Sequence, residues 1–489
     1  MQGPVRFLPA FAVFLFLIHL GWVLADPDKP LCDPGTGWHV KLGQLMVEEG
    51  RLPDTDPLSY TLPGRPWIDY QWLSHVLMGL LHHAGGLPLV TAGWSILFGL
   101  IPVLMARRLM RDGVPVLVAW FLGFLGYLIL TMHAQVRPHV VTYLFLLVQM
   151  AVLVRGGRGR WVLPVLFVLW ANFHAGFVAG LVVLAGYAAG ECLSELWQTR
   201  RIPRASLKSW LLLGASCGLA TAINPWGFGL HHHILDLMGM QSVALWHEYQ
   251  PVWHLDGANV GLFYLLAAGW IGMVATRFRS LRGGEVIAGA VLLFFAAGSA
   301  RHVNLFVIVA LPVVGAGLRD LVQRLHPAGM EASGRLLAGQ LRRWTTWGYV
   351  ALFSAGFAAL SLRAPGFFRQ DLRGMQVGAG ALGVIEGLPV SERIFHPESL
   401  GGVLAYTFGP ERKIFIDDRL DYYGDDFFMG TYFPLMSGGG KWREILSAHG
   451  VGTALVPEKS GLARVMAGSP DWEVLWSDGE FNVFRRRRP

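Results

Sequence analysis

Runs of apolar residues, separated by short polar loops, follow one another through most of the chain. A helix that crosses a bilayer needs about 20 such residues. The short apolar run near residues 161–173 could be a half-helix that pairs with the next run, near residues 176–193. The first run, near residues 7–25, is long for a signal peptide and favours an uncleaved membrane anchor. The pattern predicts eleven spans, near residues 7–25, 87–106, 113–132, 138–154, 161–173, 176–193, 208–224, 258–276, 284–299, 302–318 and 345–362.

Two longer polar segments, residues 26–86 and 225–257, interrupt the apolar runs. Within the first segment, apolar residues at helical spacing predict two amphipathic helices that lie along the membrane surface. One is expected near residues 38–49 and the other near residues 69–83, with Leu80 on its apolar side. Acidic turns lie between them.

The pattern changes in the last part of the chain, residues 363–489. Short strand-like runs alternate there with helical stretches and with Gly or Pro punctuation, which predicts a small α/β domain after a membrane part, residues 1–362. The strand-like runs are Glu392–His396, Lys413–Asp417, Val451–Val456, Trp472–Trp476 and Phe481–Arg485.

Composition agrees with a polytopic α-helical membrane protein. Hydrophobic residues make up 53% of the 489 residues and charged residues 15%, whereas a soluble globular chain has about 25% charged residues. These values exclude an ordinary cytosolic enzyme, a disordered chain and a fibrous protein. Three cysteines are too few for a disulfide framework or a cysteine-based zinc site.

Charge predicts the orientation. Lys and Arg concentrate in every second loop, which places the N-terminus in the cytoplasm and residues 363–489 outside. In a bacterium this means an inner-membrane protein with a periplasmic α/β domain. The net charge of +7 follows from the same bias, so we expect membrane lipids and no nucleic acid as partners.

Two acids of the first outer segment are candidates for proton transfer. Asp33 can serve as a general base, although Asp followed by Pro34 is also a common start of a helix. Asp54 is the second candidate, while the neighbouring Asp56 fits turn chemistry better.

Two arginines at the outer ends of spans, Arg301 and Arg137, are candidates for binding a lipid-linked phosphate by charge-assisted hydrogen bonds. The alternative is that each lies at the membrane interface with its head in water. His174, in a polar turn between two spans, is a further donor-binding candidate, since polar residues at membrane depth indicate function by default. The alternative is that Asn172 and His174 form a helix-capping pair. His39 is also a donor-binding candidate.

The histidines and acids of the second outer segment allow two interpretations, a metal site and an interfacial helix. Three adjacent histidines at 231–233 cannot all face one ion on a helix, because successive side chains point about 100° apart. His232 and Asp236 have a usable spacing, and Glu248 follows them. Interfacial histidines on an amphipathic helix are the simpler interpretation, and a divalent cation remains an option.

The layout of the first outer segment carries a resemblance. A long span is followed by an early acid, Asp33, then a surface helix, Gly50-Arg-Leu-Pro53, and a Pro66-Trp pair that leads into a second helix. This order resembles the C-type glycosyltransferase superfamily of membrane enzymes, which includes protein mannosyltransferases, lipid A aminoarabinose transferases and the catalytic subunit of oligosaccharyltransferase.

The resemblance implies an activity. Such enzymes take a sugar from a polyprenyl-phosphate or polyprenyl-diphosphate carrier on the outer face of the membrane. It implies that Asp33 is the catalytic acid or base and that Arg301 binds the phosphate, and in some members a divalent ion lies at the donor phosphate.

The sequence also departs from the superfamily. Pro34 after Asp33 is closer to oligosaccharyltransferases than to mannosyltransferases, which have Asp-Glu there. The second acidic motif of oligosaccharyltransferases is absent, and residues 133–139 stand in its place. Their Trp-Trp-Asp-Tyr-Gly motif is absent as well, with only a faint similarity at residues 421–424. Protein N-glycosylation is therefore poorly supported.

The resulting hypothesis is an inverting membrane glycosyltransferase that moves a sugar from a polyprenyl-phosphate carrier to a lipid, glycan or protein acceptor of the cell envelope. Two alternatives stay open. One is a non-catalytic envelope-assembly protein with this fold, and the other is a lipid or glycan transporter, although the spans carry few of the central acids that ion coupling requires.

Overall fold

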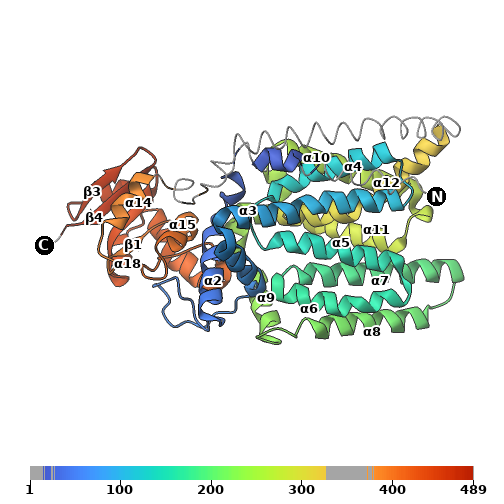
Figure 1. Ribbon diagram of the computed structural model, residues 1–489, viewed down its shortest axis with the longest axis horizontal. Coiled ribbons are helices and arrows are strands. Elements are labelled where there is room, and N and C mark those ends of the chain that lie inside the picture. The colour runs from blue at the N-terminus through green and yellow to red at the C-terminus, as the bar shows by residue number, and fades with distance from the viewer. Residues whose placement is uncertain are drawn as a thin grey trace.

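The computed structural model describes residues 28–325 and 379–487, together with residues 15, 17–23, 26, 370, 372 and 377. A bundle of long helices forms one end of the molecule, and a smaller α/β part forms the other (Figure 1). The helix α2 (Thr36–Glu49) lies between them.

Each of the nine expected spans between residues 87 and 318 coincides with a helix. The two remaining spans, near 7–25 and 345–362, lie largely or wholly outside the described residues. The nine helices are α3 (Trp72–Arg111), α4 (Val116–Leu130), α5 (His139–Arg155), α6 (Leu163–Phe173), α7 (Phe177–Thr199), α8 (Arg204–Ala220), α10 (Ala258–Arg277), α11 (Gly283–Gly298) and α12 (Val303–Leu325).

Within the described residues, five helices are long and apolar enough to cross a membrane: α3, α7, and the helices α4, α10 and α12 with their adjoining 3-10 turns. Two shorter apolar helices, α5 and α11, lie among them. Length and composition therefore support a membrane protein, while the total of eleven crossings stays a prediction.

The second surface helix and the second span form one element, α3, that is bent at a glycine pair. Gly85 and Gly86 leave helical geometry inside α3, and Gly86 has a φ of 66°. A left-handed φ suits glycine because it has no Cβ. The bend sets the first part of α3 against α2, away from the direction of the bundle (Figure 1).

The two helices of the first outer segment pack through glycines. α2 ends at Gly50, whose φ is 64°. A Cβ on Gly43 of α2 would lie 2.0 Å from the backbone oxygen of His75, and one on Gly79 of α3 would lie 2.2 Å from that of Gly43. The buried face of this part of α3 carries Ser74, His75, Met78 and Gly79, whereas Leu80 on the expected apolar side is 51% exposed.

The second outer segment contains α9 (Gly229–Gly239) and three 3-10 turns, η5 (Ser242–Leu245), η6 (His247–Tyr249) and η7 (Val252–His254). Two further 3-10 turns, η3 (Thr131–His133) and η9 (Ala300–His302), precede α5 and α12. These short turns bring polar side chains to the end of the bundle that faces the α/β part.

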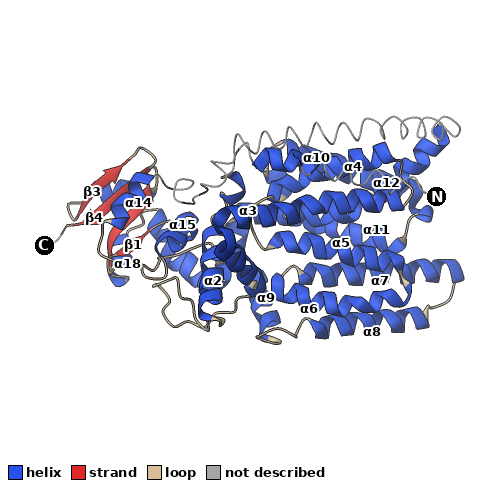
Figure 2. Ribbon diagram, viewed as in Figure 1, coloured by secondary structure: helices blue, strands red, loops and turns tan. Residues whose placement is uncertain are grey.

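The C-terminal part is α/β, as predicted, and its sheet is confined to that end of the molecule (Figure 2). The sheet order is β1-β2-β4-β3, with a parallel β1–β2 pair and antiparallel pairs elsewhere. The strands are β1 (Arg393–Phe395), β2 (Val451–Pro457), β3 (Trp472–Ser477) and β4 (Phe481–Arg486). The helices are α14 (Ala379–Glu386), α15 (Glu398–Phe408), α16 (Leu420–Phe427), α17 (Phe433–Met436), α18 (Trp442–Ala448) and α19 (Gly461–Ala467).

The expected strand at Lys413–Asp417 does not form. Its only bridge joins Ile414 to Ser59 of the first outer segment. Phe415 and Ile416 of this run are fully buried. The apolar pattern therefore indicates a buried segment and not a strand of the sheet. The bridge ties the α/β part to the loop between α2 and α3.

Candidate functional site

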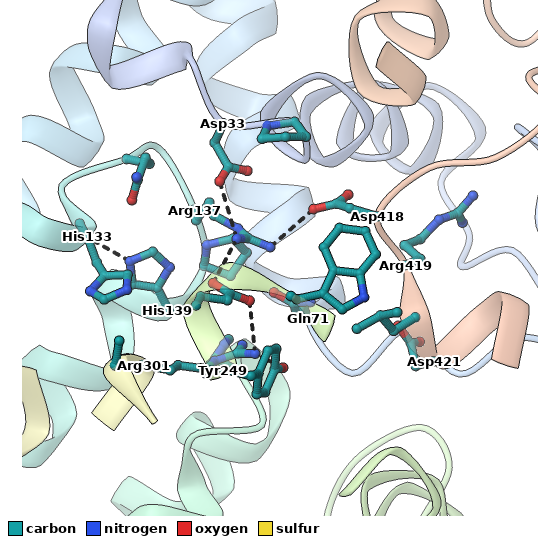
Figure 3. A pocket seen from close by; sticks show the side chains of 18 of the residues that line it. Asp33, Gln71, His133, Arg137, His139, Tyr249, Arg301, Asp418, Arg419 and Asp421 are labelled. Carbon is teal, nitrogen blue, oxygen red and sulfur yellow. Dashed lines mark hydrogen bonds and ion pairs between the residues drawn. The ribbon is translucent and has the colours of Figure 1, made fainter. Parts of the chain in front are cut away.

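A cavity of about 370 Å³ lies where the helical bundle meets the C-terminal part. Its wall is built from the segment before α2, the turn before α5, the 3-10 turns η6 and η9, and the loop that leads into α16 (Figure 3). The charged side chains that line it are Asp33, Arg137, Glu248, Arg301, Asp418, Arg419 and Asp421.

Arg137 lies among three carboxylates. Its Nη1 is 3.2 Å from Oδ2 of Asp33 and 3.4 Å from Oε2 of Glu248. Its Nη2 is 3.3 Å from Oδ2 of Asp418 (Figure 3). One guanidinium therefore joins three chain segments that are far apart in the sequence. We call these four residues the Arg137 cluster.

Arg301 extends this cluster through Glu248. Its Nη1 is 3.3 Å from Oε1 of Glu248 and donates a hydrogen bond to the Tyr249 hydroxyl. The guanidinium also lies over the Tyr249 ring, 4.8 Å from its centre. The side chain keeps 30% exposure, so an anionic ligand in the cavity can reach it.

Asp33 does more than start a helix. Its Oδ1 accepts a hydrogen bond from the Gly35 amide at 2.8 Å, while Gly35 rather than Asp33 occupies the N-cap position of α2. A Cβ on Gly35 would lie 3.0 Å from the Asp418 carboxylate and 3.1 Å from that of Asp33. Glycine at position 35 thus lets the two acids approach each other.

Burial and charge separate the acids of the cavity. Burial raises the pKa of Asp33 above its usual range, against the positive charge of Arg137. Burial also raises the pKa of Asp418 to about 6. Burial alone would raise the pKa of Glu248, but Arg301 and Arg137 hold it well below its usual range. Glu248 is therefore ionised at neutral pH, and the other two acids accept a proton more readily.

A second cavity, of about 340 Å³, adjoins the first and runs between α7, α11 and α12. Both cavities share a wall formed by residues such as Tyr70, His174, Glu248, Tyr249 and Arg301. Beyond that wall the lining is mainly apolar and includes Val178, Ala179, Val182, Leu292, Phe295 and Leu305. The two cavities together offer a polar chamber joined to an apolar slot.

The two candidate histidines lie in different surroundings. His174 lines both cavities, and its Nδ1 accepts a hydrogen bond from the Gly176 amide at 2.9 Å. His39 lines neither of them. It is buried against His75, which bonds to Asp69, and burial keeps its pKa well below the usual value. Its placement gives it no direct contact with a ligand in either cavity.

Three other candidates lie outside the cavities. Asp54 is exposed, as are His232 and Asp236 on α9, whereas Glu248 belongs to the Arg137 cluster. In the part of the chain that the structure describes, no group of three or more His, Cys, Asp or Glu side chains is arranged to hold a metal ion.

Two further residues of the cavity, Asp418 and Arg419, belong to a run of acids and aromatic residues whose pattern suits carbohydrate recognition and a salt-bridged strand end equally well. The Trp38 indole donates to Asp418 at 2.5 Å. Arg419 is 2% exposed and pairs with Asp417 and Asp56 at 2.7 and 2.8 Å. The signal was the run of acids and aromatic residues after Phe415, but no local pattern indicates that it packs on the first outer segment. Asp56 has a structural role, as its place in a turn predicted, because its carboxylate accepts hydrogen bonds from the Leu58 and Ser59 amides.

Comparison with known proteins gives a fold match. The archaeal oligosaccharyltransferase AglB from Archaeoglobus fulgidus, solved in complex with an inhibitory peptide and a dolichol-phosphate, is similar with a TM-score of 0.57 and 11% identity, over 92% of this chain and 70% of that one. The Archaeoglobus fulgidus oligosaccharyltransferase tethered to an acceptor peptide is similar with a TM-score of 0.54 and 11% identity, over 91% of this chain and 69% of that one.

No protein-family model matches the sequence, and no curated protein matches it. The likeness therefore rests on three-dimensional arrangement, and at this identity it shows the fold alone. The chain shares its fold with an archaeal oligosaccharyltransferase, a member of the C-type glycosyltransferase superfamily, and this agrees with the fold that the resemblance implies.

Proposed function

We propose that this protein is a membrane glycosyltransferase that transfers a sugar from a polyprenyl-phosphate carrier to an acceptor of the cell envelope. The observation that carries the proposal is the polar cavity with two arginines that opens into an apolar slot between membrane helices. A lipid-linked phosphate needs both environments, since its chain is apolar and its phosphate is anionic. The fold likeness to AglB, whose structure contains a dolichol-phosphate, supports the same class of donor.

The donor would lie with its chain between α7, α11 and α12 and its phosphate near Arg301. Arg301 lines the cavity, and Tyr249 holds its guanidinium in place. Stabilising the charge that develops on the departing polyprenyl phosphate is the main electrostatic task of such a reaction.

Asp33 is the base of this proposal. An acceptor hydroxyl attacks the anomeric carbon, the bond from that carbon to the phosphate oxygen breaks, and the hydroxyl proton passes to the Asp33 carboxylate. Direct displacement inverts the anomeric centre. A carboxylate whose pKa burial raises is better suited to take this proton than an exposed one.

The acceptor is a lipid, glycan or protein on the outer face. In the proposed orientation the cavity and the α/β part lie outside the cytoplasm, which in a bacterium is the periplasmic side of the inner membrane. The second oligosaccharyltransferase structure was tethered to an acceptor peptide containing the NVT sequon. The missing acidic motif of this chain argues against the same acceptor here.

Binding of polyprenyl phosphate to the purified protein in lipid nanodiscs tests the proposal. Because a hydrogen bond to a charged group is worth about 1.5–3 kcal/mol, Arg301→Ala should weaken binding by about 10- to 100-fold. Arg65→Ala is the matched control, because Arg65 is exposed, binds the Tyr423 carbonyl and lines neither cavity. Equal affinity in the two variants would contradict the placement of the phosphate.

A non-catalytic envelope-assembly protein is the second candidate, and one observation favours it. Asp33 is already paired with Arg137 and bonded to the Gly35 amide, as a purely structural carboxylate would be. On this candidate, Asp33→Asn would leave every envelope glycan unchanged.

A further inference from the structure

The Arg137 cluster has an unusual composition. Three carboxylates from separate segments, Asp33, Glu248 and Asp418, surround a single guanidinium within 3.2 to 3.4 Å. Asp418 is 281 positions away from Arg137 in the sequence. Buried acids repel one another, so a cation must hold such a group together.

Arg137 is fixed in position by its own backbone. Its carbonyl accepts a hydrogen bond from the Trp94 indole at 2.8 Å, and its amide donates to the Gln135 carbonyl at 2.9 Å. Pro138 follows as the N-cap of α5. The side chain thus enters the group of acids from a rigid point, with 20% of its surface exposed.

The resemblance to C-type glycosyltransferases implies a divalent ion at the donor phosphate in some members. A Mg²⁺ or Ca²⁺ ion needs several oxygens at about 2.0–2.6 Å from one point. Here the point on which the carboxylates of Asp33 and Glu248 converge is Nη1 of Arg137. The described acids therefore do not fit a divalent ion while Arg137 is in place.

A guanidinium suits this position for physical reasons. It carries a permanent charge and five N–H donors in one plane, so it can bind several carboxylates at once. Its single charge also leaves the cluster more negative than a divalent ion would. Glu248 connects this group to Arg301, which adds the second positive charge of the cavity.

We propose that Arg137 is the fixed cation of this site and stands where a divalent metal ion would otherwise gather the same three carboxylates. The transfer reaction then needs no added divalent cation, and Arg137 acts as a positioning residue for Asp33. The role of the cluster in sugar transfer rests on the proposed function. The way in which Arg137 holds the three carboxylates together does not.

Mn²⁺ binding measured by electron paramagnetic resonance tests the inference without substrate. Wild-type protein, treated with a chelator and then titrated with Mn²⁺, should show no tightly bound ion in the cavity. Arg137→Ala frees three carboxylates and should bind one Mn²⁺ per chain, because carboxylates suit this ion. The double variant Arg137→Ala with Asp418→Asn should lose that ion again. Arg65→Ala is the matched control and should bind no more Mn²⁺ than the wild type.

Two results would overturn the inference. One is a tightly bound Mn²⁺ in the wild type that Asp33→Asn removes. The other is a folded Arg137→Ala protein that binds no more Mn²⁺ than the wild type. If Arg137→Ala does not fold, Arg137→Gln keeps more of the side-chain volume, and the wild-type measurement needs no variant at all. Because no sugar donor is present, a failed glycosyltransferase assay leaves these outcomes intact.

Discussion

Asp33 owes its chemistry to its neighbours. Its carboxylate is 8% exposed, bonds to the Gly35 amide and pairs with Arg137. Arg137 would favour the charged form, but burial is the larger effect and raises the pKa of Asp33. The same imbalance raises the pKa of Asp418 to about 6. Two neighbouring acids with raised pKa values mark this cavity as a candidate for proton transfer.

The pH dependence of transfer follows from these shifts. A general base works only when ionised, so the rate should fall as the pH drops through the raised pKa of Asp33. The acid limb of kcat/KM should therefore lie above the range of an exposed Asp, whose pKa is about 3.9. Asp418→Asn removes a neighbouring negative charge and leaves Arg137 freer to pair with Asp33, so the limb should move to lower pH. If Asp418→Asn leaves the acid limb at the same pH, the transfer rate does not depend on the ionisation of Asp33.

Residue types pointed to part of the cavity. Asp33, Arg137, Arg301 and His174 line it, and each stood out as a polar residue at the outer end of an apolar run. His39 also stood out, but a sequence cannot show that its ring is enclosed against His75.

At the scale of elements, the contact between α2 and α3 depends on two glycines. The backbone of Gly43 fills the space that a Cβ on Gly79 would need, at 2.2 Å. Neither backbone can move without separating the helices. This contact holds α2, the helix that follows Asp33, against α3.

Gly79→Ala should therefore destabilise the protein by about 1–3 kcal/mol, the usual cost of overpacking. Gly99→Ala is the control on the same helix, because a Cβ at Gly99 meets nothing within 4 Å. Thermal unfolding in detergent measures both variants. Equal unfolding temperatures would mean that the helices do not approach as closely as the structure has them.

Local pattern predicted most of the elements. Nine expected spans coincide with helices, and four of the five strand-like runs are strands. The failure at Lys413–Asp417 has a physical reason, since an apolar run of that length fits a buried segment as well as a strand. The expected surface helix and the span that follows it form one bent helix, α3. The bend depends on the backbone conformation of Gly86, which the pattern of apolar residues does not predict.

At the scale of the whole molecule, the α/β part is bound to the first outer segment by buried polar contacts. Arg419 pairs with Asp417 and Asp56 and lies 4.9 Å from the centre of the Trp67 ring. At a second point of contact, a Cβ on Gly402 of α15 would lie 1.9 Å from the Pro34 carbonyl oxygen. The cavity therefore exists only while both parts stay docked.

Arg419→Ala should undock them, because it leaves two buried carboxylates without their partner, at a cost of about 3–5 kcal/mol. Arg443→Ala removes a surface ion pair with Asp471, 53% and 57% exposed, and should change stability by less than about 1 kcal/mol. Limited proteolysis of the loop between α2 and α3 reports the difference. Identical cleavage rates would show that Arg419 does not hold the two parts together.

The assembly of the site was beyond prediction from sequence. Its contacts join positions 281, 363 and 380 residues apart, as in the pairs Arg137–Asp418, Arg419–Asp56 and Trp38–Asp418. Periodicity reports which face of an element is buried, but not which distant segment covers it. The likeness of layout to C-type glycosyltransferases indicated that the first outer segment matters, yet not that residues 417–421 complete its cavity.

In the proposed function, this protein transfers a sugar on the outer face of the membrane with Asp33 as base. Mass spectrometry of envelope glycans and glycolipids tests this proposal. It compares a strain without the gene, complemented with wild type or with Asp33→Asn at equal membrane levels. Asp54→Asn, whose carboxylate is exposed, tests the other candidate acid. We predict a sugar that wild type and Asp54→Asn restore and Asp33→Asn does not. Unchanged glycans in the strain without the gene, or full restoration by Asp33→Asn, would contradict the account.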